Sequence, residues 1–380
     1  MHNLAGMSEH IETLIIGGGQ AGLAVGYNLA RSGHPFLILE SNERIGDSWR
    51  KRWDSLRVFT PAKYNGLPGM RFPAPPLSFP SKNAVADFQA AYAKQFKLPV
   101  RTSTRVDGLR QDGDCYVVTA GKSTYEADNV VIATGANQIP KIPAFASGLK
   151  PGINQMHSSE YRSPAQLQEG DVLVVGVGNS GAEIGYELSR TRRVSLAGSP
   201  AAELPFPHGA AAAAFALPLV RFLGTHVLNV DTPVGRRAQL GFLRRGAPLI
   251  RVKMKNLVAA GVERVPRVAG VRDGLLLLAD ERVLDVANVI WCTGFKTDFA
   301  WVHLPAFDDD GRPIQYRGVV PPLPGLYFMG LEFQYSATSG VLPGIVRDAR
   351  YVAEHIATRV ALRAKAAETF GEYAEVRMPR

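Results

Sequence analysis

The chain has 380 residues, enough for two domains of ordinary size, and its 38 Gly and 26 Pro indicate a loop-rich globular protein. The net charge of +9 is spread along the chain, which disfavours nucleic-acid binding and fits phosphorylated cofactors. The two cysteines, Cys115 and Cys292, stand far apart and outside any metal-ligand spacing. We therefore expect neither a disulfide framework nor a metal site.

The N-terminus lacks the basic flank and apolar run of a signal peptide. The longest apolar stretch, Ala210 to Val220, contains Pro218 and is well short of the ~20 residues that span a bilayer. We expect a cytoplasmic protein of a reducing compartment, without a membrane span.

The first expected unit is a buried strand, Thr13 to Ile16, followed by a glycine-rich turn and a helix. Gly17, Gly19 and Gly22 form GxGxxG, in which glycines allow a tight turn and the close approach of a pyrophosphate to a helix N-terminus. Glu40 ends the next apolar run, where an acid accepts hydrogen bonds from a ribose. The combination predicts a dinucleotide site.

A Pro-rich stretch, residues 61–80, comes next and precedes a helix predicted over 84–96. Short strands are expected around 115–119 and 130–133. The glycine pattern then repeats, because the apolar run 172–175 leads into a second GxGxxG. Its members are Gly176, Gly178 and Gly181, with Asn179 and Ser180 between the last two. Ser199 stands where the first copy has an acid, so the second ribose is expected to be held differently.

Two dinucleotide sites in one chain imply electron transfer between two cofactors. Residues 206–257 are apolar and basic, and two interpretations stay open: helical packing inside the second domain, or a cap over a substrate pocket. A C-terminal helix is predicted over 344–366, after Pro343. We predict an α/β fold with two Rossmann-like domains, the second inserted in the first: residues 1–148, 149–296 and 297–380.

Several further motifs occur in an order similar to that of class B flavin monooxygenases. They are Gly46-Asp47-Ser48-Trp49, Trp53-Asp54-Ser55-Leu56, Ala133-Thr134-Gly135 with Pro140 and Pro143, the segment 157–161, the second glycine motif, and Trp291-Cys292-Thr293-Gly294-Phe295. The resemblance covers about residues 11 to 360 and is closest to the compact bacterial flavin-containing monooxygenases and the plant YUCCA enzymes.

The resemblance implies that the first site binds FAD and the second binds NADPH or NADH. It assigns to FAD the residues Gly17, Gly19, Gly22, Glu40, Gly46, Trp49, Val106, Ala133, Thr134, Gly135 and Gly330. It assigns to NAD(P) the residues Gly176, Gly178, Asn179, Ser180, Gly181 and Ser199. In such enzymes reduced FAD forms a C4a-(hydro)peroxide with O2 that oxygenates a small organic substrate, a soft nucleophile or a ketone.

The chain departs from the family at three places. Many members have an Asn where this chain has Phe59, which we interpret as a pocket-lining residue that cannot donate a hydrogen bond. His157 and Tyr161 match only the end of the family's FxGxxxHxxxY fingerprint. We therefore interpret His157 as a structural residue between the domains, and prefer this to a catalytic role. Related enzymes often have an Arg at Ser199, and its absence predicts relaxed use of NADH and NADPH.

Two other functions stay open. One is an NAD(P)H-dependent reductase or oxidase that does not oxygenate a substrate, and the other is a flavin-binding redox sensor. A disulfide reductase is disfavoured because the chain has no CxxC. The expected partners are a small-molecule substrate and O2, not nucleic acid, and a homodimer is left open.

Overall fold

The computed structural model describes residues 8–200, 202–245 and 247–376. Its first sheet has seven strands in the order β3-β2-β1-β6-β5-β4, with β17 paired to β6. The strands are β1 (Glu9–Ile16), β2 (Phe36–Leu39), β3 (Val100–Arg101), β4 (Gly108–Asp112), β5 (Cys115–Ala120), β6 (Ser123–Ile132) and β17 (Leu326–Phe328). β1 lies parallel to β2 and β6, and β17 lies parallel to β6. The carboxyl ends of β1, β2, β6 and β17 therefore meet at one edge.

Both faces of this sheet are covered because its central strands are apolar on both sides, and the face away from the helices packs against side chains of residues 299–331. One face packs against α1 (Gln20–Arg31), α3 (Lys82–Gln95) and α8 (Leu342–Val376), whose buried side chains share one core. The short helix α2 (Asp47–Arg50) lies next to α3. The helix predicted over 84–96 thus begins two residues earlier, after the N-cap Ser81, whose side chain accepts a hydrogen bond from the Ala84 amide.

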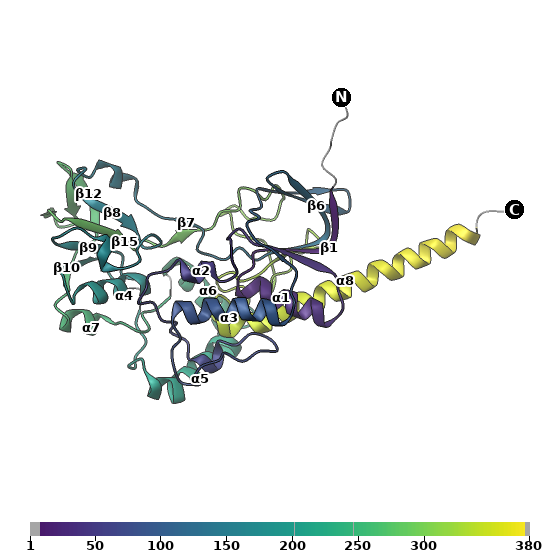
Figure 1. Ribbon diagram of the computed structural model, residues 1–380, viewed down its shortest axis with the longest axis horizontal. Coiled ribbons are helices and arrows are strands. Elements are labelled where there is room, and N and C mark those ends of the chain that lie inside the picture. The colour runs from purple at the N-terminus through teal and green to yellow at the C-terminus, as the bar shows by residue number, and fades with distance from the viewer. Residues whose placement is uncertain (1–7, 201, 246, 377–380) are drawn as a thin grey trace, which may run out of the picture.

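The second sheet has five parallel strands in the order β11-β10-β9-β15-β8. They are β8 (Asn154–His157), β9 (Val172–Val175), β10 (Val194–Ala197), β11 (Glu263–Val265) and β15 (Asn288–Trp291). Helices α4 (Asn179–Leu188) and α7 (Met254–Ala259) pack on it, and β12 (Val268–Arg272), β13 (Leu275–Leu278) and β14 (Val283–Leu284) form a small antiparallel sheet. In Figure 1 this half lies beside the first sheet.

The chain passes between the halves through a two-stranded sheet of β7 (Ile139–Pro140) and β16 (Phe295–Lys296). It leaves after β6 and returns to add β17 to the first sheet. The predicted α/β class with two Rossmann-like units is confirmed, whereas the limits at 148 and 296 stay predictions.

Residues 209–245, here called the helical lobe, contain α5 (Leu217–Phe222), which lies at the lower margin of the molecule in Figure 1, and α6 (Pro233–Arg245), which lies nearer α2 and α3 in that view. Two π-helical turns, Ala212–Ala216 and Leu223–Val227, flank α5. The lobe packs on the first half: Val230 N donates to Tyr335 O, and the rings of Phe242 and Phe333 lie 5.8 Å apart. The interpretation that the apolar segment packs inside the second domain is therefore wrong for residues 209–245. It is correct for Leu249 and Leu257, which belong to the core of the second half.

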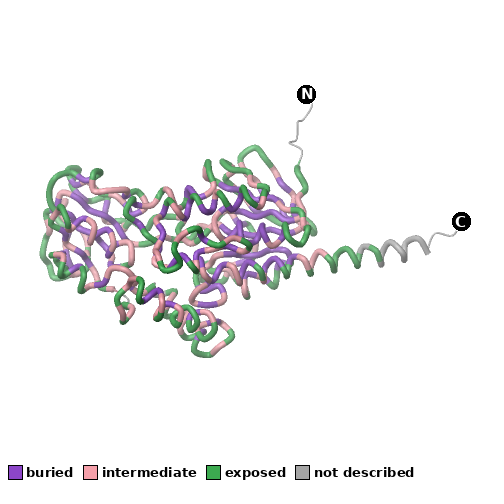
Figure 2. The backbone as a smooth tube through the Cα atoms, turned by 60° about the horizontal axis from the view of Figure 1, so that its bottom comes forward, coloured by how far each residue is buried: buried purple, intermediate pink, exposed green. Residues whose placement is uncertain are grey.

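The remaining short 3-10 helices are Ala62–Tyr64, Ala144–Gly148 and Pro164–Gln166. The C-terminal helix α8 begins two residues before the predicted start and continues past residue 366. Its exposed part before residue 366 leads away from the body in Figure 2. Within the described residues no helix is long and apolar enough to cross a bilayer.

Candidate active site

The first glycine motif forms a turn between β1 and α1. Gly17 has φ 112°, and a Cβ added there would lie 2.5 Å from the Ala133 carbonyl oxygen. A Cβ on Gly22 would lie 2.0 Å from the Gly17 carbonyl oxygen. Both positions are closed to any side chain. A Cβ on Gly19 would instead meet nothing within 4 Å, so the turn has one face packed against protein and one face open.

The open face lies at the N-terminus of α1. Gly19 is the N-cap, no side chain caps the helix, and its first turn holds no acidic residue. Backbone N–H groups at a helix start attract anions, because they lack intrahelical partners and lie at the positive end of the helix dipole. The structure therefore offers a cradle for a pyrophosphate, in agreement with the chemistry of a dinucleotide.

Glu40 is buried directly beside this turn. Its Oε2 accepts a hydrogen bond of 2.7 Å from the Gly18 amide, and Oε1 accepts one of 2.8 Å from the Asn42 amide. The carboxylate is thus fixed at the carboxyl end of β2, next to the glycine turn. This is the position from which an acid can accept hydrogen bonds from a ribose diol.

Two further predicted residues border the cradle from other segments, and a third, Gly46, packs against α3. Trp49 Nε1 donates a hydrogen bond of 3.1 Å to Gln20 Oε1 on the first turn of α1. Gly330, at φ 82°, comes after β17 in the chain and lies close to α1, since a Cβ added there would be 3.2 Å from the Cβ of Ala21. Gly46, at φ 91°, is needed for packing, since a Cβ there would lie 2.4 Å from the Ala86 carbonyl oxygen.

The other predicted residues of the first site lie on connecting segments. Thr134 and Gly135 follow β6, and Gln138 Nε2 donates to the Thr134 hydroxyl at 2.9 Å and to the Gly135 carbonyl at 2.7 Å. Val106, in the loop before β4, packs half-buried against the core on the opposite face of the sheet from α1. For Val106 the structure shows a packing role.

The second motif repeats the geometry of the first. Gly176 has φ 108°, and a Cβ there would lie 2.4 Å from the Cys292 carbonyl oxygen. A Cβ on Gly181 would lie 2.0 Å from the Gly176 carbonyl oxygen, whereas a Cβ on Gly178 would meet nothing within 4 Å. Gly178 is the N-cap of α4, again without a side-chain cap. The chain therefore holds two cradles of the same construction.

Asn179 begins α4 and its side chain is already engaged. Its Nδ2 donates to the Pro248 carbonyl at 3.0 Å, and its Oδ1 accepts from the Ile250 amide at 3.0 Å. It therefore holds residues 248–250 against the second cradle. Ser180 lies beside it in the first turn, half-buried. The backbone amides and the Ser180 hydroxyl are the groups of this turn that remain for a phosphate.

Ser199 is exposed just beyond the carboxyl end of β10. Arg192 and Arg193 precede the same strand, at its opposite end. Arg192 donates to the carbonyls of Leu167 and Gln168, and Arg193 lies 3.9 Å from the Glu263 carboxylate. Neither arginine can reach the turn at Ser199.

Arg267 lies close to this turn, and the sequence patterns did not indicate it as a site residue. The amide of Gly198, next to Ser199, donates to the Val265 carbonyl at the end of β11, two residues before Arg267. The Arg267 side chain is exposed, and within the described part of the chain it has no ion-pair partner. Arg267 is placed near Ser199 by the order of the strands in the second sheet, which a single sequence does not reveal.

The two halves meet around Phe59. The Phe59 carbonyl accepts a hydrogen bond of 2.9 Å from His208 Nε2, and the His208 ring lies 4.0 Å from that of Phe79. Burial lowers the pKa of His208, a residue that sequence reasoning also missed. The neutral imidazole fits its role as a donor to a backbone carbonyl.

A half-buried ion pair lies at the same junction. Arg251 lies 2.8 Å from the Glu183 carboxylate of α4 and also donates to the Arg57 carbonyl at 3.0 Å. Burial raises the pKa of Glu183 to about 7, although Arg251 opposes the shift. Desolvation therefore outweighs the attraction of the guanidinium.

His157 is fully buried at the end of β8. The Ser159 amide donates to Nδ1 at 3.1 Å, so Nε2 carries the proton and donates to the Gly294 carbonyl at 3.1 Å. Burial lowers the pKa of His157. Both ring nitrogens are thus occupied within the protein, at the start of the crossing strand β16, which favours a structural role.

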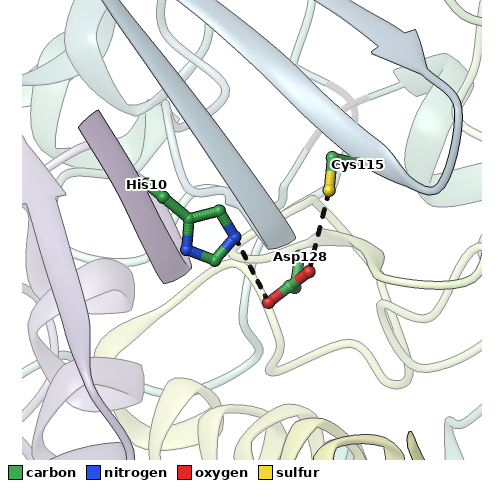
Figure 3. Close-up of side chains that lie close together, drawn as sticks. All are labelled: His10, Cys115 and Asp128. Atoms are coloured by element: carbon green, nitrogen blue, oxygen red, sulfur yellow. Dashed lines mark hydrogen bonds and ion pairs between the residues drawn. The ribbon is translucent and has the colours of Figure 1, made fainter. Parts of the chain in front are cut away.

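A group of three potential metal ligands lies away from both cradles. Figure 3 shows His10, Cys115 and Asp128, with 3.6 Å between His10 Nε2 and Asp128 and 3.8 Å between Cys115 Sγ and Asp128. Arg363 already pairs with the Asp128 carboxylate at 3.1 Å. The pKa of Cys115 is raised, mainly by burial and secondarily by the negative charge of Asp128. A metal requires the thiolate and a free carboxylate, so we assign the group to surface hydrogen bonding.

Known proteins resemble both the sequence and the fold. The family model for pyridine nucleotide-disulphide oxidoreductases matches residues 14–201. The uncharacterized CzcO-like oxidoreductase of Geobacillus kaustophilus is 37% identical over 360 residues, covering 92% of this chain and 99% of that protein. The probable indole-3-pyruvate monooxygenase YUCCA1 of Arabidopsis thaliana is 35% identical over 198 residues, 50% of this chain and 48% of that protein.

Among solved structures, the flavin-containing monooxygenase from Stenotrophomonas maltophilia superposes with a TM-score of 0.73 at 26% identity, covering 92% of this chain and 99% of that chain. Two cradles on two Rossmann-like sheets, together with these likenesses, define an oxidoreductase of the class B flavin monooxygenase type. At 37% identity over nearly its full length, the chain belongs to the family of the CzcO-like oxidoreductases.

Proposed function

We propose that the chain binds FAD in the first cradle and NADPH or NADH in the second, and that it oxygenates a small organic substrate. The observation that carries the proposal is the duplicated cradle: Gly19 and Gly178 each face open space at an uncapped helix N-terminus. Two such sites suit a hydride transfer between two dinucleotides better than the binding of one ligand.

The fit of FAD to the first cradle rests on this chain's own residues. The amides at the start of α1 would hold the pyrophosphate, Glu40 would accept from the ribose, and Trp49 and Gly330 would border the ring system. When bound, FAD would supply hydride acceptance and the reaction with O2. The protein's part is to bind and orient both dinucleotides and to exclude water.

For the second cofactor we propose that Arg267 and Ser199 together meet the adenosine ribose. Both lie at the carboxyl ends of neighbouring parallel strands, β11 and β10, and Arg267 has an unpaired guanidinium within the described residues. Because no acid stands at this turn, the 2′-phosphate of NADPH is not repelled. We expect both nicotinamide cofactors to work, with a modest preference for NADPH.

The substrate is proposed to be small and largely apolar. A hollow of about 520 Å³ lies between the Pro-rich segment and α3, lined mostly by apolar side chains. Its lining includes Met70, Phe72, Phe79 and Phe88, together with Arg57 and Asp87. The proposed soft nucleophile or ketone suits such a lining.

A reductase or oxidase without oxygenation is the second candidate, and Phe59 favours it because a phenyl ring offers no hydrogen-bond donor where many members of the resembled family have an Asn. A disulfide relay is disfavoured, since Cys292 is buried and burial raises its pKa to about 12.

The test is anaerobic reduction of the purified protein by NADPH or NADH, followed by admission of O2 with and without a panel of sulfides and ketones. Monooxygenation predicts that a substrate raises NAD(P)H consumption and gives an oxygenated product. If every electron pair appears as H2O2 with every substrate, the reductase or oxidase alternative holds instead.

A further inference from the structure

The helical lobe, residues 209–245, carries its large apolar side chains on the outside. Phe215 is 82% exposed, Leu219 59% and Phe222 55%, whereas Ala212 and Ala213 on the same helical stretch are buried. The small alanines pack against Phe79 and Phe206 of the body. A helix that only packed on a soluble protein would bury the phenyl and leucyl groups and expose the alanines.

The exposed apolar side chains around α5 form a row. Phe215, Leu219, Leu223 and Val227 recur every four residues, with Phe222 beside Leu223, so they lie along one side of this stretch. Further members on α5 and α6 are Val220, Val234, Leu240 and Leu243. In Figure 1 α5 lies at the lower margin of the molecule, and a row of exposed apolar side chains of this kind marks an interaction site.

Positive charge accompanies this face. The sequence from 209 to 245 contains five arginines and a single acidic residue, Asp231. Arg221 and Arg237 are exposed, whereas the carboxylate of Asp231 accepts hydrogen bonds from the hydroxyls of Tyr316 and Tyr335. The surface that the lobe presents is therefore apolar and cationic, which is complementary to an apolar layer beneath an anionic one.

The lobe is fixed to the body by contacts on its other side. The hydroxyls of Thr225 and Thr338 lie 3.1 Å apart, and Arg347 donates to the Thr225 carbonyl. Gly224 lies against the same loop, where a Cβ would come within 3.1 Å of the Thr338 methyl group. The exposed face thus stands on a rigid base and keeps its orientation relative to the two cradles.

We propose that the helical lobe docks the protein onto the surface of an anionic lipid bilayer, with Phe215, Leu219 and Phe222 among the acyl chains and the exposed Arg221 and Arg237 at the headgroups. The lobe lies in the interface and does not span it, since no described helix is long and apolar enough to do so. A second copy of the chain fits this face poorly, because a symmetric contact would bring arginines against arginines. The inference is independent of the proposed function.

The experiment is vesicle flotation of the full chain with vesicles of phosphatidylcholine containing about one third phosphatidylglycerol, and with pure phosphatidylcholine vesicles. We expect at least tenfold more protein to float with the anionic vesicles, and about 0.5 M salt to abolish most of the difference by screening. The triple variant Phe215→Ser, Leu219→Ser, Phe222→Ser should lose flotation at least tenfold, and Arg221→Gln with Arg237→Gln should lose the preference for anionic vesicles.

The matched control replaces exposed apolar residues outside the lobe, Val283→Ser with Ile314→Ser, and should float like the unmodified protein. Thermal unfolding and bound-cofactor content show that each variant is folded. No flotation of the unmodified protein overturns the proposal. So does sedimentation showing a dimer that the triple variant alone converts to a monomer, because the face would then be an interface between copies.

Discussion

Gly19 and Gly22 belong to one motif yet have different surroundings. A Cβ on Gly22 would collide with the Gly17 carbonyl, so any substitution there disturbs the turn itself. A side chain on Gly19 would enter only the open space in front of α1. Gly19→Val should therefore leave the fold intact and lower FAD retention at least tenfold, because its branched side chain occupies the place of the pyrophosphate. Absorbance at about 450 nm per chain, with circular dichroism, measures both.

The control is Gly178→Val in the second cradle, whose surroundings are the same. It should keep FAD and raise the KM for NADPH and NADH. Full FAD occupancy in Gly19→Val, or FAD loss in Gly178→Val with Gly19→Val unaffected, would show that the two cradles are assigned to the wrong cofactors.

Arg267 decides how strongly NADPH is preferred. A charged hydrogen bond contributes about 1.5–3 kcal/mol, so Arg267→Ala should raise the KM for NADPH by one to two powers of ten and leave that for NADH nearly unchanged. Arg193→Ala, at the opposite end of β10, is the control. Steady-state kcat/KM with both cofactors is the measurement, and equal losses for NADH and NADPH would place Arg267 away from the 2′-phosphate. A native NADPH preference above about a thousandfold would contradict the expected relaxed use.

Phe59 bears on the coupling of NAD(P)H oxidation to product. The unmodified protein should release appreciable H2O2 per NAD(P)H even with a good substrate, because Phe59 donates no hydrogen bond. Phe59→Asn should lower that fraction, and Phe59→Leu, which also lacks a donor, should not. Tight coupling in the unmodified protein would show that the missing amide is unimportant.

At the scale of elements, α4 is tied to the first half through Glu183 and Arg251. The folded-state pKa of Glu183 is raised to about 7, above the ordinary value of 4.5, so the folded protein binds the extra proton between these pH values. The free energy of unfolding should therefore fall as pH rises through this window, by up to about 3 kcal/mol.

Glu183→Gln removes this titration. Denaturant unfolding between pH 4.5 and 8 should show the variant gaining stability relative to the unmodified protein as pH rises, with the exposed Glu263→Gln as control. Parallel curves for Glu183→Gln and the unmodified protein would contradict the shift.

Several elements were predictable because local pattern determines them. The apolar runs before Gly17 and Gly176 became β1 and β9, and the helices after them begin at Gly19 and Gly178 as N-caps. Single-sequence patterns failed where a partner from a distant segment matters. The helical lobe lies against the loop around Thr338, and nothing in its own apolar composition indicates that contact.

At the scale of the whole molecule, the repeated motif predicted two Rossmann-like halves, and the structure adds how they meet. The ends of β1, β2, β6 and β17 form one cradle and those of β9, β10, β11 and β15 the other, with His208 and Arg251 at the junction. Arg267 and His208 could not be found from spacing, because strand order and domain contact place them.

The central claim is that electrons from NAD(P)H, passed through a flavin in the first cradle, place an atom of O2 in an organic product. The direct measurement is turnover under ¹⁸O2 with NADPH and a panel of sulfides and ketones, analysed by mass spectrometry of the products. The account predicts one ¹⁸O atom in the product of at least one substrate, in proportion to the NADPH consumed above the substrate-free rate. Flavin reduction and O2 uptake with label found only in H2O2 or water, across the whole panel, would contradict it.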